Sequence, residues 1–182
     1  MKHPFYEETL SSQPIFEGRI ISLQVDTVRL PDGGTATREI VRHPGAVAVV
    51  ALLEGRLLVV EQYRKPLERA QVEIPAGKLE KDEDPYEAAI RELEEETGYK
   101  ARSLTHLQTF STSPGFAEEI IHLYFTDDLE KGEVNLDEEE FLTCEALSLE
   151  QALEYVRIGR IYDAKTIMAV QAWRLKTLTG EF

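Results

Sequence analysis

Three glutamates in one short stretch have the residue type and the spacing to bind a metal ion. Glu92, Glu95 and Glu96 stand at offsets i, i+3 and i+4, and residues at these offsets share one face of a helix. Carboxylates on a shared face repel one another. A divalent cation such as Mg²⁺, which prefers oxygen ligands and often bridges carboxylates and phosphates, would remove that repulsion. The alternative is a solvated acidic face, and helical spacing alone does not decide between the two.

The residues around these glutamates follow a motif with two fixed gaps. Five residues separate Gly77 from Glu83, seven separate Glu83 from Arg91, and Arg91 opens the run RELEEETGY. The pattern resembles the Nudix box, G-x5-E-x7-R-E-U-x-E-E-x-G-U, in which U is a bulky apolar residue. All seven fixed positions match, and Tyr99 is aromatic where an aliphatic residue is usual. The resemblance implies a Nudix hydrolase, which cleaves a nucleoside diphosphate linked to another moiety with Mg²⁺ or Mn²⁺.

Position by position, the resemblance assigns a role to each residue of the box. Two or more Mg²⁺ ions, with Mn²⁺ as a possible substitute, would be held by three side chains and one carbonyl: Glu92, Glu95, Glu96 and the backbone carbonyl of Ala76. Arg91 and Glu83 would hold the loop and the helix together rather than take part in the chemistry.

The resemblance also indicates that the catalytic base comes from a loop after the box. Residues 135–141, NLDEEEF, fit such a loop, because four consecutive acids will not pack in a core. The predicted base is Glu139 or Glu140, with Glu138 as the third choice, and it would act together with Glu96. A solvated acidic turn is the alternative for most of these residues.

A second motif bears on the substrate. Pro114 stands 16 residues after Gly98, within the run SPGF. This offset and setting resemble the bacterial ADP-ribose pyrophosphatase branch of the Nudix family, although an ordinary turn would use the same residues. The likeness extends from about residue 15 to the end of the chain, and it implies hydrolysis of ADP-ribose to AMP and ribose 5-phosphate. The alternatives are another substrate, such as a sugar nucleotide, NADH, a dinucleotide or an oxidised nucleotide, and a non-catalytic nucleotide-binding sensor.

Five residues outside the metal set are predicted to contact the substrate: Arg38, Glu39, Arg64, Glu73 and Pro114. Arg64 could pair with a diphosphate oxygen or form a surface salt bridge. Glu73, in the strand that enters the box, could bind a ribose hydroxyl or assist the metal site. Arg38 and Glu39 could reach the site of a neighbouring subunit or lie on a solvated strand face.

Turn and capping residues divide the chain into elements. Pro31 to Gly34 form a predicted hairpin turn between strands at 17–30 and 36–42, and His43-Pro44-Gly45 precedes the apolar strand AVAVVALL. Three helices are expected, each with an N-cap residue before it and a glycine at its end: they follow Asp84, Ser148 and Asp163 and end at Gly98, Gly159 and Gly180.

The predicted fold class is α+β. Residues 45–182 would form the Nudix fold, a mixed sheet sandwiched between helices, and residues 1–44 a small antiparallel β appendage. The appendage is too short for a core of its own, so it must fold back on the main domain or pair with a second subunit. In the branch that the chain resembles, the N-terminal strands are exchanged within a homodimer, and both chains line each pocket.

Composition limits the partners. The 182 residues carry a formal net charge of −14 and are 42% hydrophobic, which argues against broad electrostatic binding to nucleic acid or to an anionic membrane. The single cysteine, Cys144, excludes an internal disulfide. The longest apolar stretch is too short to span a bilayer, and no secretory signal is visible, so we expect a soluble cytoplasmic protein.

Overall fold

The structure is a computed structural model that describes residues 3–136 and 141–182. The chain forms two compact units. The first comprises Met1–Gly45 and Phe110–Ile121, and the second comprises Ala46–Thr109 and His122–Phe182.

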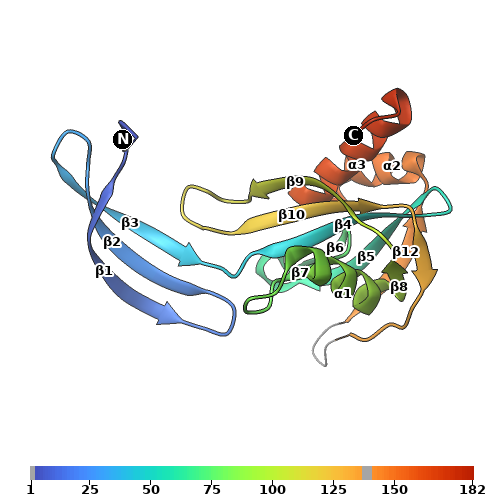
Figure 1. Cartoon of the computed structure of the whole chain (residues 1–182), viewed down its shortest axis with the longest axis horizontal. Coiled ribbons are helices and arrows are strands. Elements are labelled where there is room, and N and C mark those ends of the chain that lie inside the picture. The colour runs from blue at the N-terminus through green and yellow to red at the C-terminus, as the bar shows by residue number, and fades with distance from the viewer. Residues whose placement is uncertain (1–2, 137–140) are drawn as a thin grey trace. The chain divides into compact units, whose positions relative to one another are not determined.

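The first unit is built on a three-stranded antiparallel sheet in the order β1-β2-β3 (Figure 1). Its strands are β1 (Glu8–Glu17), β2 (Ser22–Arg29) and β3 (Thr35–Arg42). The predicted hairpin between β2 and β3 is confirmed: Leu30 N donates to Gly34 O, and Gly33 takes the left-handed conformation that a glycine permits (φ 89°). The strand β1 was not predicted, and it lies at an edge of the sheet.

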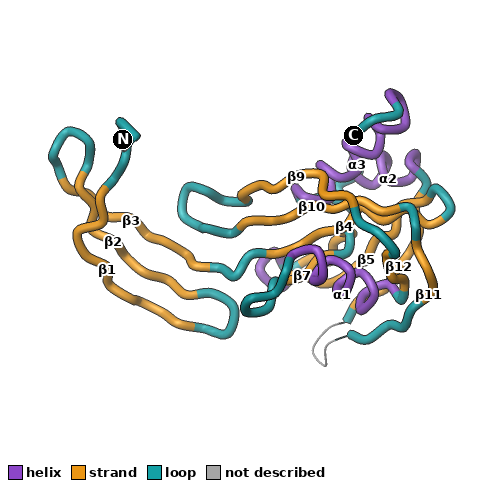
Figure 2. Tube along the Cα trace, in the orientation of Figure 1, coloured by secondary structure: helices purple, strands orange, loops and turns teal. Residues whose placement is uncertain are grey.

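Most of a seven-stranded sheet lies in the second unit, and the end of β9 and the start of β10 belong to the first. The main path of this sheet is β12-β5-β4-β10-β9 (Figure 2), with β6 paired to β5 and β7 to β4. The strands and the short 3₁₀ helix η1 are β4 (Ala46–Leu53), β5 (Arg56–Arg64), η1 (Lys65–Leu67), β6 (Arg69–Glu73), β7 (Ala76–Lys78), β9 (Thr105–Ser111), β10 (Ile120–Thr126) and β12 (Leu142–Leu147). A separate two-stranded sheet pairs β8 (Tyr99–Ala101) with β11 (Leu129–Lys131).

Three helices cover this sheet: α1 (Pro85–Thr97), α2 (Leu149–Arg157) and α3 (Ala164–Thr179). Successive side chains of a strand point to opposite faces, and both faces of β4 are buried. One face packs in a single cluster with α1; its members include Val47, Val49, Ala51, Ala88, Ala89 and Leu93. Helix α3 also contacts β4, and α2 contacts β5 and β12. The predicted α+β architecture, a sheet between helices, is confirmed.

The helix boundaries also follow the prediction, because each N-cap side chain is bonded to the first turn. Asp84 accepts from Tyr86 N, Asp163 accepts from Thr166 N, and Ser148 forms a reciprocal capping box with Gln151. Helix α1 ends on Gly98 in the left-handed conformation (φ 72°). The second half of α1 carries the three glutamates of the predicted metal site, and the start of α3 carries part of a second polar cluster.

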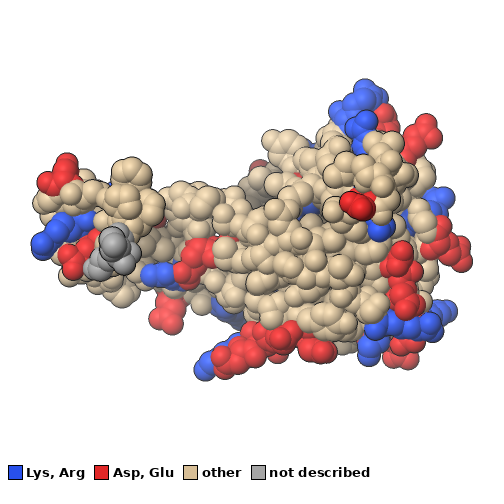
Figure 3. Space-filling view, turned by 45° about the horizontal axis from the view of Figure 1, so that its top comes forward, with Lys and Arg blue, Asp and Glu red and all other residues tan. Residues whose placement is uncertain are grey.

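No helix in the described part of the chain is long and apolar enough to cross a membrane. On the face shown in Figure 3, blue Lys and Arg side chains lie in small groups beside red Asp and Glu side chains.

Candidate active site

The three glutamates of the box lie on α1, and each has a partner there or on a neighbouring strand. Arg91 Nη1 donates to Glu92 Oε1 at 2.8 Å and to Glu95 Oε2 at 2.9 Å. Glu96 is 2% exposed, and its Oε2 accepts a hydrogen bond of 3.0 Å from Ala76 N at the start of β7. The fold thus brings the predicted ligand Ala76 against Glu96, and Arg91 bridges the other two carboxylates.

Arg91 also ties α1 to the loop before it. Its Nε and Nη2 donate to Glu83 Oε1 and Oε2, both at 2.9 Å. Glu83 Oε2 accepts from Glu80 N in addition. The Arg91 guanidinium holds the pKa of Glu83 below its usual range, and the surrounding carboxylates raise the pKa of Arg91. These contacts confirm the predicted structural role of Arg91 and Glu83.

The glycine that opens the box allows a close approach between β7 and α1. A Cβ atom built on Gly77 would lie 1.9 Å from Glu92 Cδ and 2.0 Å from Glu92 Oε2. Any larger residue at this position would displace the Glu92 carboxylate. The first glycine of the motif therefore has a steric explanation, which does not depend on a special backbone angle.

The donor set fits a hard divalent cation in its chemistry. It consists of oxygen atoms only, from three carboxylates on one helix face and a peptide carbonyl beside the buried Glu96. Within residues 3–136 and 141–182, no three His, Cys, Asp or Glu side chains are already gathered closely enough to hold an ion. Arg91 supplies the positive charge at Glu92 and Glu95 in this arrangement.

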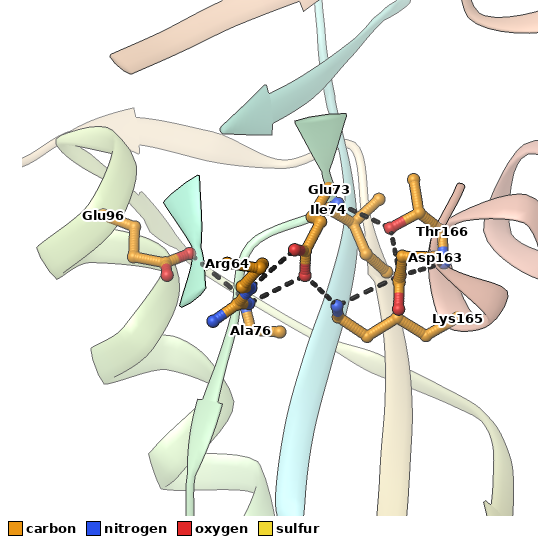
Figure 4. A network of polar contacts seen from close by, with 8 residues as sticks. All are labelled: Arg64, Glu73, Ile74, Ala76, Glu96, Asp163, Lys165 and Thr166. Carbon is orange, nitrogen blue, oxygen red and sulfur yellow. Dashed lines mark hydrogen bonds and ion pairs between the residues drawn. The ribbon is translucent and has the colours of Figure 1, made fainter. Parts of the chain in front are cut away.

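A second polar cluster joins β5, β6 and α3 (Figure 4). Arg64 donates from Nε to Glu73 Oε1 at 2.7 Å and from Nη2 to Glu73 Oε2 at 2.8 Å. The ammonium of Lys165 also donates to Glu73 Oε2. Burial of Glu73, which is 2% exposed, favours its protonation, but the Arg64 and Lys165 cations outweigh burial and hold its pKa at about 2.

The start of α3 anchors this cluster to the strand that leads into the box. Asp163 Oδ2 accepts from Lys165 Nζ at 3.0 Å and from the Thr166 backbone and hydroxyl. Thr166 Oγ1 in turn accepts from Ile74 N at 3.0 Å. Lys165 was not predicted as a site residue. The signal that could have identified it is a lysine one turn before the apolar residues Ala169 and Val170, which the structure buries together with it.

The remaining predicted substrate residues lie in the first unit. Arg38, on β3, is half-buried and makes a bidentate ion pair with Glu7 at 2.9 and 2.5 Å. Glu39 and Pro114 are exposed, and Pro114 lies in a turn in which Ser113 O accepts hydrogen bonds from two following amides. The predicted bases Glu138, Glu139 and Glu140 lie outside the described residues.

The chain is similar in sequence and in fold to several known proteins. Residues 41–167 match the family described as NUDIX domain, and residues 7–41 match the nucleoside diphosphate sugar hydrolase N-terminal domain. A methanol dehydrogenase activator from Bacillus methanolicus is 57% identical, over 94% of this chain and 95% of that protein. An ADP-ribose pyrophosphatase from Bacillus subtilis is 53% identical, over 93% of this chain and 94% of that protein. A crystal structure of an ADP compounds hydrolase shares the fold with a TM-score of 0.85 at 22% identity, covering 99% of this chain and 98% of that one.

Proposed function

The chain belongs to the Nudix hydrolase family, and from this membership we propose that it hydrolyses the diphosphate of ADP-ribose to AMP and ribose 5-phosphate. The observation that carries the proposal is the polar face of α1, where the buried Glu96 is held against the backbone of Ala76 beside Glu92 and Glu95. Relatives described as ADP-ribose pyrophosphatases support this choice of substrate.

Nudix hydrolases in general need divalent metal ions, and we propose two or more Mg²⁺ ions at this site, with Mn²⁺ as a substitute. The proposed ligands are Glu92, Glu95, Glu96 and the carbonyl of Ala76. Bound ions would neutralise diphosphate oxygens and lower the pKa of a water molecule. Glu96 is already oriented by Ala76 N, and Arg91 restrains Glu92 and Glu95. Metal binding at this site would require the Glu92 and Glu95 carboxylates to shift from Arg91 toward the ions.

Hydrolysis needs a base and a group that holds the diphosphate. In the proposed reaction, the water oxygen bonds to phosphorus, the bridging P–O bond breaks, and the proton of water passes to a loop glutamate. We assign that base to Glu139 or Glu140, and Glu138 ranks third. Arg64 is the proposed diphosphate ligand. Its two hydrogen bonds to the Glu73 carboxylate fix the guanidinium, and 38% of its side chain stays exposed.

We propose that the protein acts as a homodimer whose N-terminal strands are exchanged. All ten residues of the edge strand β1 are exposed, and an exposed edge pairs readily with another chain. Several exposed apolar side chains lie in the same unit: Phe5, Leu10, Ile15, Phe16 and Ile20. In such a dimer, Arg38, Glu39 and Pro114 would line the pocket. Sedimentation of I15D/F16D tests the arrangement: we expect a monomer, and an unchanged dimer would contradict it.

The activity is tested with purified protein, ADP-ribose and Mg²⁺, with chromatographic identification of products. We expect AMP and ribose 5-phosphate, and we expect E96Q to lose on the order of 10²-fold or more in kcat. The matched control is E94Q, which changes a glutamate on the same helix that instead approaches Lys100 at 3.7 Å. Equal rates for E96Q and wild type would refute the assignment of Glu96 to the active site. Faster turnover of sugar nucleotides, NADH or a dinucleotide than of ADP-ribose would refute ADP-ribose as the substrate. If no compound is turned over, a nucleotide sensor becomes the favoured function.

A second candidate function is activation of a dehydrogenase. It is favoured by the similarity to the protein from Bacillus methanolicus that is described as a methanol dehydrogenase activator. The test adds the chain, or its E96Q variant, to a methanol dehydrogenase and measures methanol oxidation. Stimulation by wild type but not by E96Q would mean that activation depends on hydrolysis. Stimulation by both would mean that it depends on contact.

A further inference from the structure

Lys165 is a buried cation at the start of α3. It is 8% exposed, and its ammonium contacts Glu73 and lies 3.0 Å from Asp163 Oδ2. A lysine charge is almost never buried without an acid beside it, because desolvation of an unpaired charge is costly. Two carboxylates therefore fix the position of this ammonium.

Glu73 is shared between two cations, which approach its carboxylate from opposite sides in Figure 4. Arg64 binds it through a fork of two N–H groups, and Lys165 binds Oε2. The fork fixes the plane of the Arg64 guanidinium and leaves further N–H groups on it. Arg64 is thus both held in one orientation and, at 38% side-chain exposure, accessible to a ligand.

The second cation changes the charge that Arg64 presents. An isolated Arg64–Glu73 pair would be neutral and would attract an anion weakly. Lys165, on α3, binds the same carboxylate and neutralises part of its negative charge. Arg64 then keeps part of its own positive charge. Asp163, which balances Lys165, is itself bonded by Thr166 N and Oγ1 at a helix N-terminus, where the dipole stabilises its negative charge.

We propose that Lys165 is a positioning residue for the substrate: by sharing Glu73 with Arg64, it keeps the Arg64 guanidinium aimed and positively charged toward an anionic diphosphate. This inference rests on the proposed hydrolysis of a nucleoside diphosphate derivative. It adds to that site a residue of α3 that acts through Glu73 rather than by contact with the substrate.

The test compares K165M with K176M, a change of the same type on the same helix at a lysine that packs over Phe125 and Phe182. We expect K165M to raise KM for ADP-ribose at least about fivefold with little change in kcat, because the lost attraction acts on ground state and transition state alike. The dissociation constant of α,β-methylene ADP-ribose, measured by calorimetry, should rise by the same factor. K176M should leave both values unchanged.

The double variant E73Q/K165M separates charge from packing. It removes one negative and one positive charge, so the cluster regains its original charge balance, but a glutamine at 73 can accept only one of the two Arg64 N–H groups. A charge role predicts that KM falls below that of K165M without reaching the wild-type value, because the fork is lost, whereas a packing role predicts that the two changes add and KM rises further. If K165M does not fold, K165Q takes its place in each comparison.

The failures of the two proposals differ. A wild type that does not turn over ADP-ribose refutes the proposed function. If the wild type is active but K165M has an unchanged KM, the proposed role of Lys165 is wrong. It is also wrong if the double variant has a higher KM than K165M. Neither result contradicts the proposed hydrolysis.

Discussion

Substitution of Gly77 by alanine should separate activity from stability. The added Cβ would lie 1.9 Å from Glu92 Cδ, so the carboxylate must move by about 1.5 Å to reach an ordinary contact of 3.4 Å. The displaced group is the end of a flexible side chain, which loses a half-buried ion pair with Arg91. That loss costs about 0–1 kcal/mol, and the alanine returns a similar amount by restricting the unfolded chain. We therefore expect the free energy of unfolding to change by less than about 1 kcal/mol.

The activity should respond much more strongly, because misplacing a reacting group by about 1 Å can cost on the order of 10²-fold in rate. The assay is kcat for ADP-ribose in Mg²⁺, with thermal unfolding of the same samples. Gly132 supplies the matched control, because a Cβ there would lie 2.5 Å from Glu94 Oε1, on the same helix but outside the proposed site. G132A should keep its activity within about twofold. A fully active G77A, or a G132A that loses as much, would refute the reasoning.

Three further changes test the polar contacts. The folded-state pKa of Glu73 is lowered to about 2, so the stability that its charge contributes is present above about pH 4.5 and is lost as the pH falls toward 2. Urea unfolding at pH 7 and pH 3 tests this: E73Q should be less stable than wild type at pH 7, and the difference should shrink at pH 3. R91K should lower the unfolding temperature at pH 7, because a lysine cannot reproduce the fork to Glu83, and an unchanged temperature would contradict this role. T166V should reduce the free energy of unfolding by about 1–3 kcal/mol, since it leaves the buried Ile74 amide without its acceptor; a loss below the error of urea titration would refute it.

The helices could be predicted from the sequence because their ends depend on local contacts. Asp84, Ser148 and Asp163 bond amides within their own first turn, and Gly98 needs only its own left-handed angle. The structural role of Arg91 was predictable for a related reason, since its partners lie on its own helix or in the loop just before it. A spacing rule is sufficient where both partners of a contact are near in sequence.

The strand β1 and the residue Lys165 could not be predicted in the same way. The strand β1 contains Pro14 and a polar run, and its pairing with β2 shifts register twice, so the sequence shows no clean alternation there. Lys165 is 92 residues from Glu73, and no local pattern reports which acid a distant lysine will meet. Both features depend on tertiary pairing, which overrides local preference.

The charges at the site explain how an acidic protein could bind an anionic substrate. In the cluster at the start of α3, Glu73 and Asp163 are balanced by Arg64 and Lys165. In the box, Glu83, Glu92 and Glu95 pair with the guanidinium of Arg91, and Glu96 is held by the amide of Ala76. Four carboxylates and one guanidinium leave three negative charges. Two divalent cations would turn that excess into one positive charge. Calorimetry with α,β-methylene ADP-ribose should therefore show weak binding in EDTA and tighter binding as Mg²⁺ is added, and an affinity that does not depend on Mg²⁺ would contradict this account.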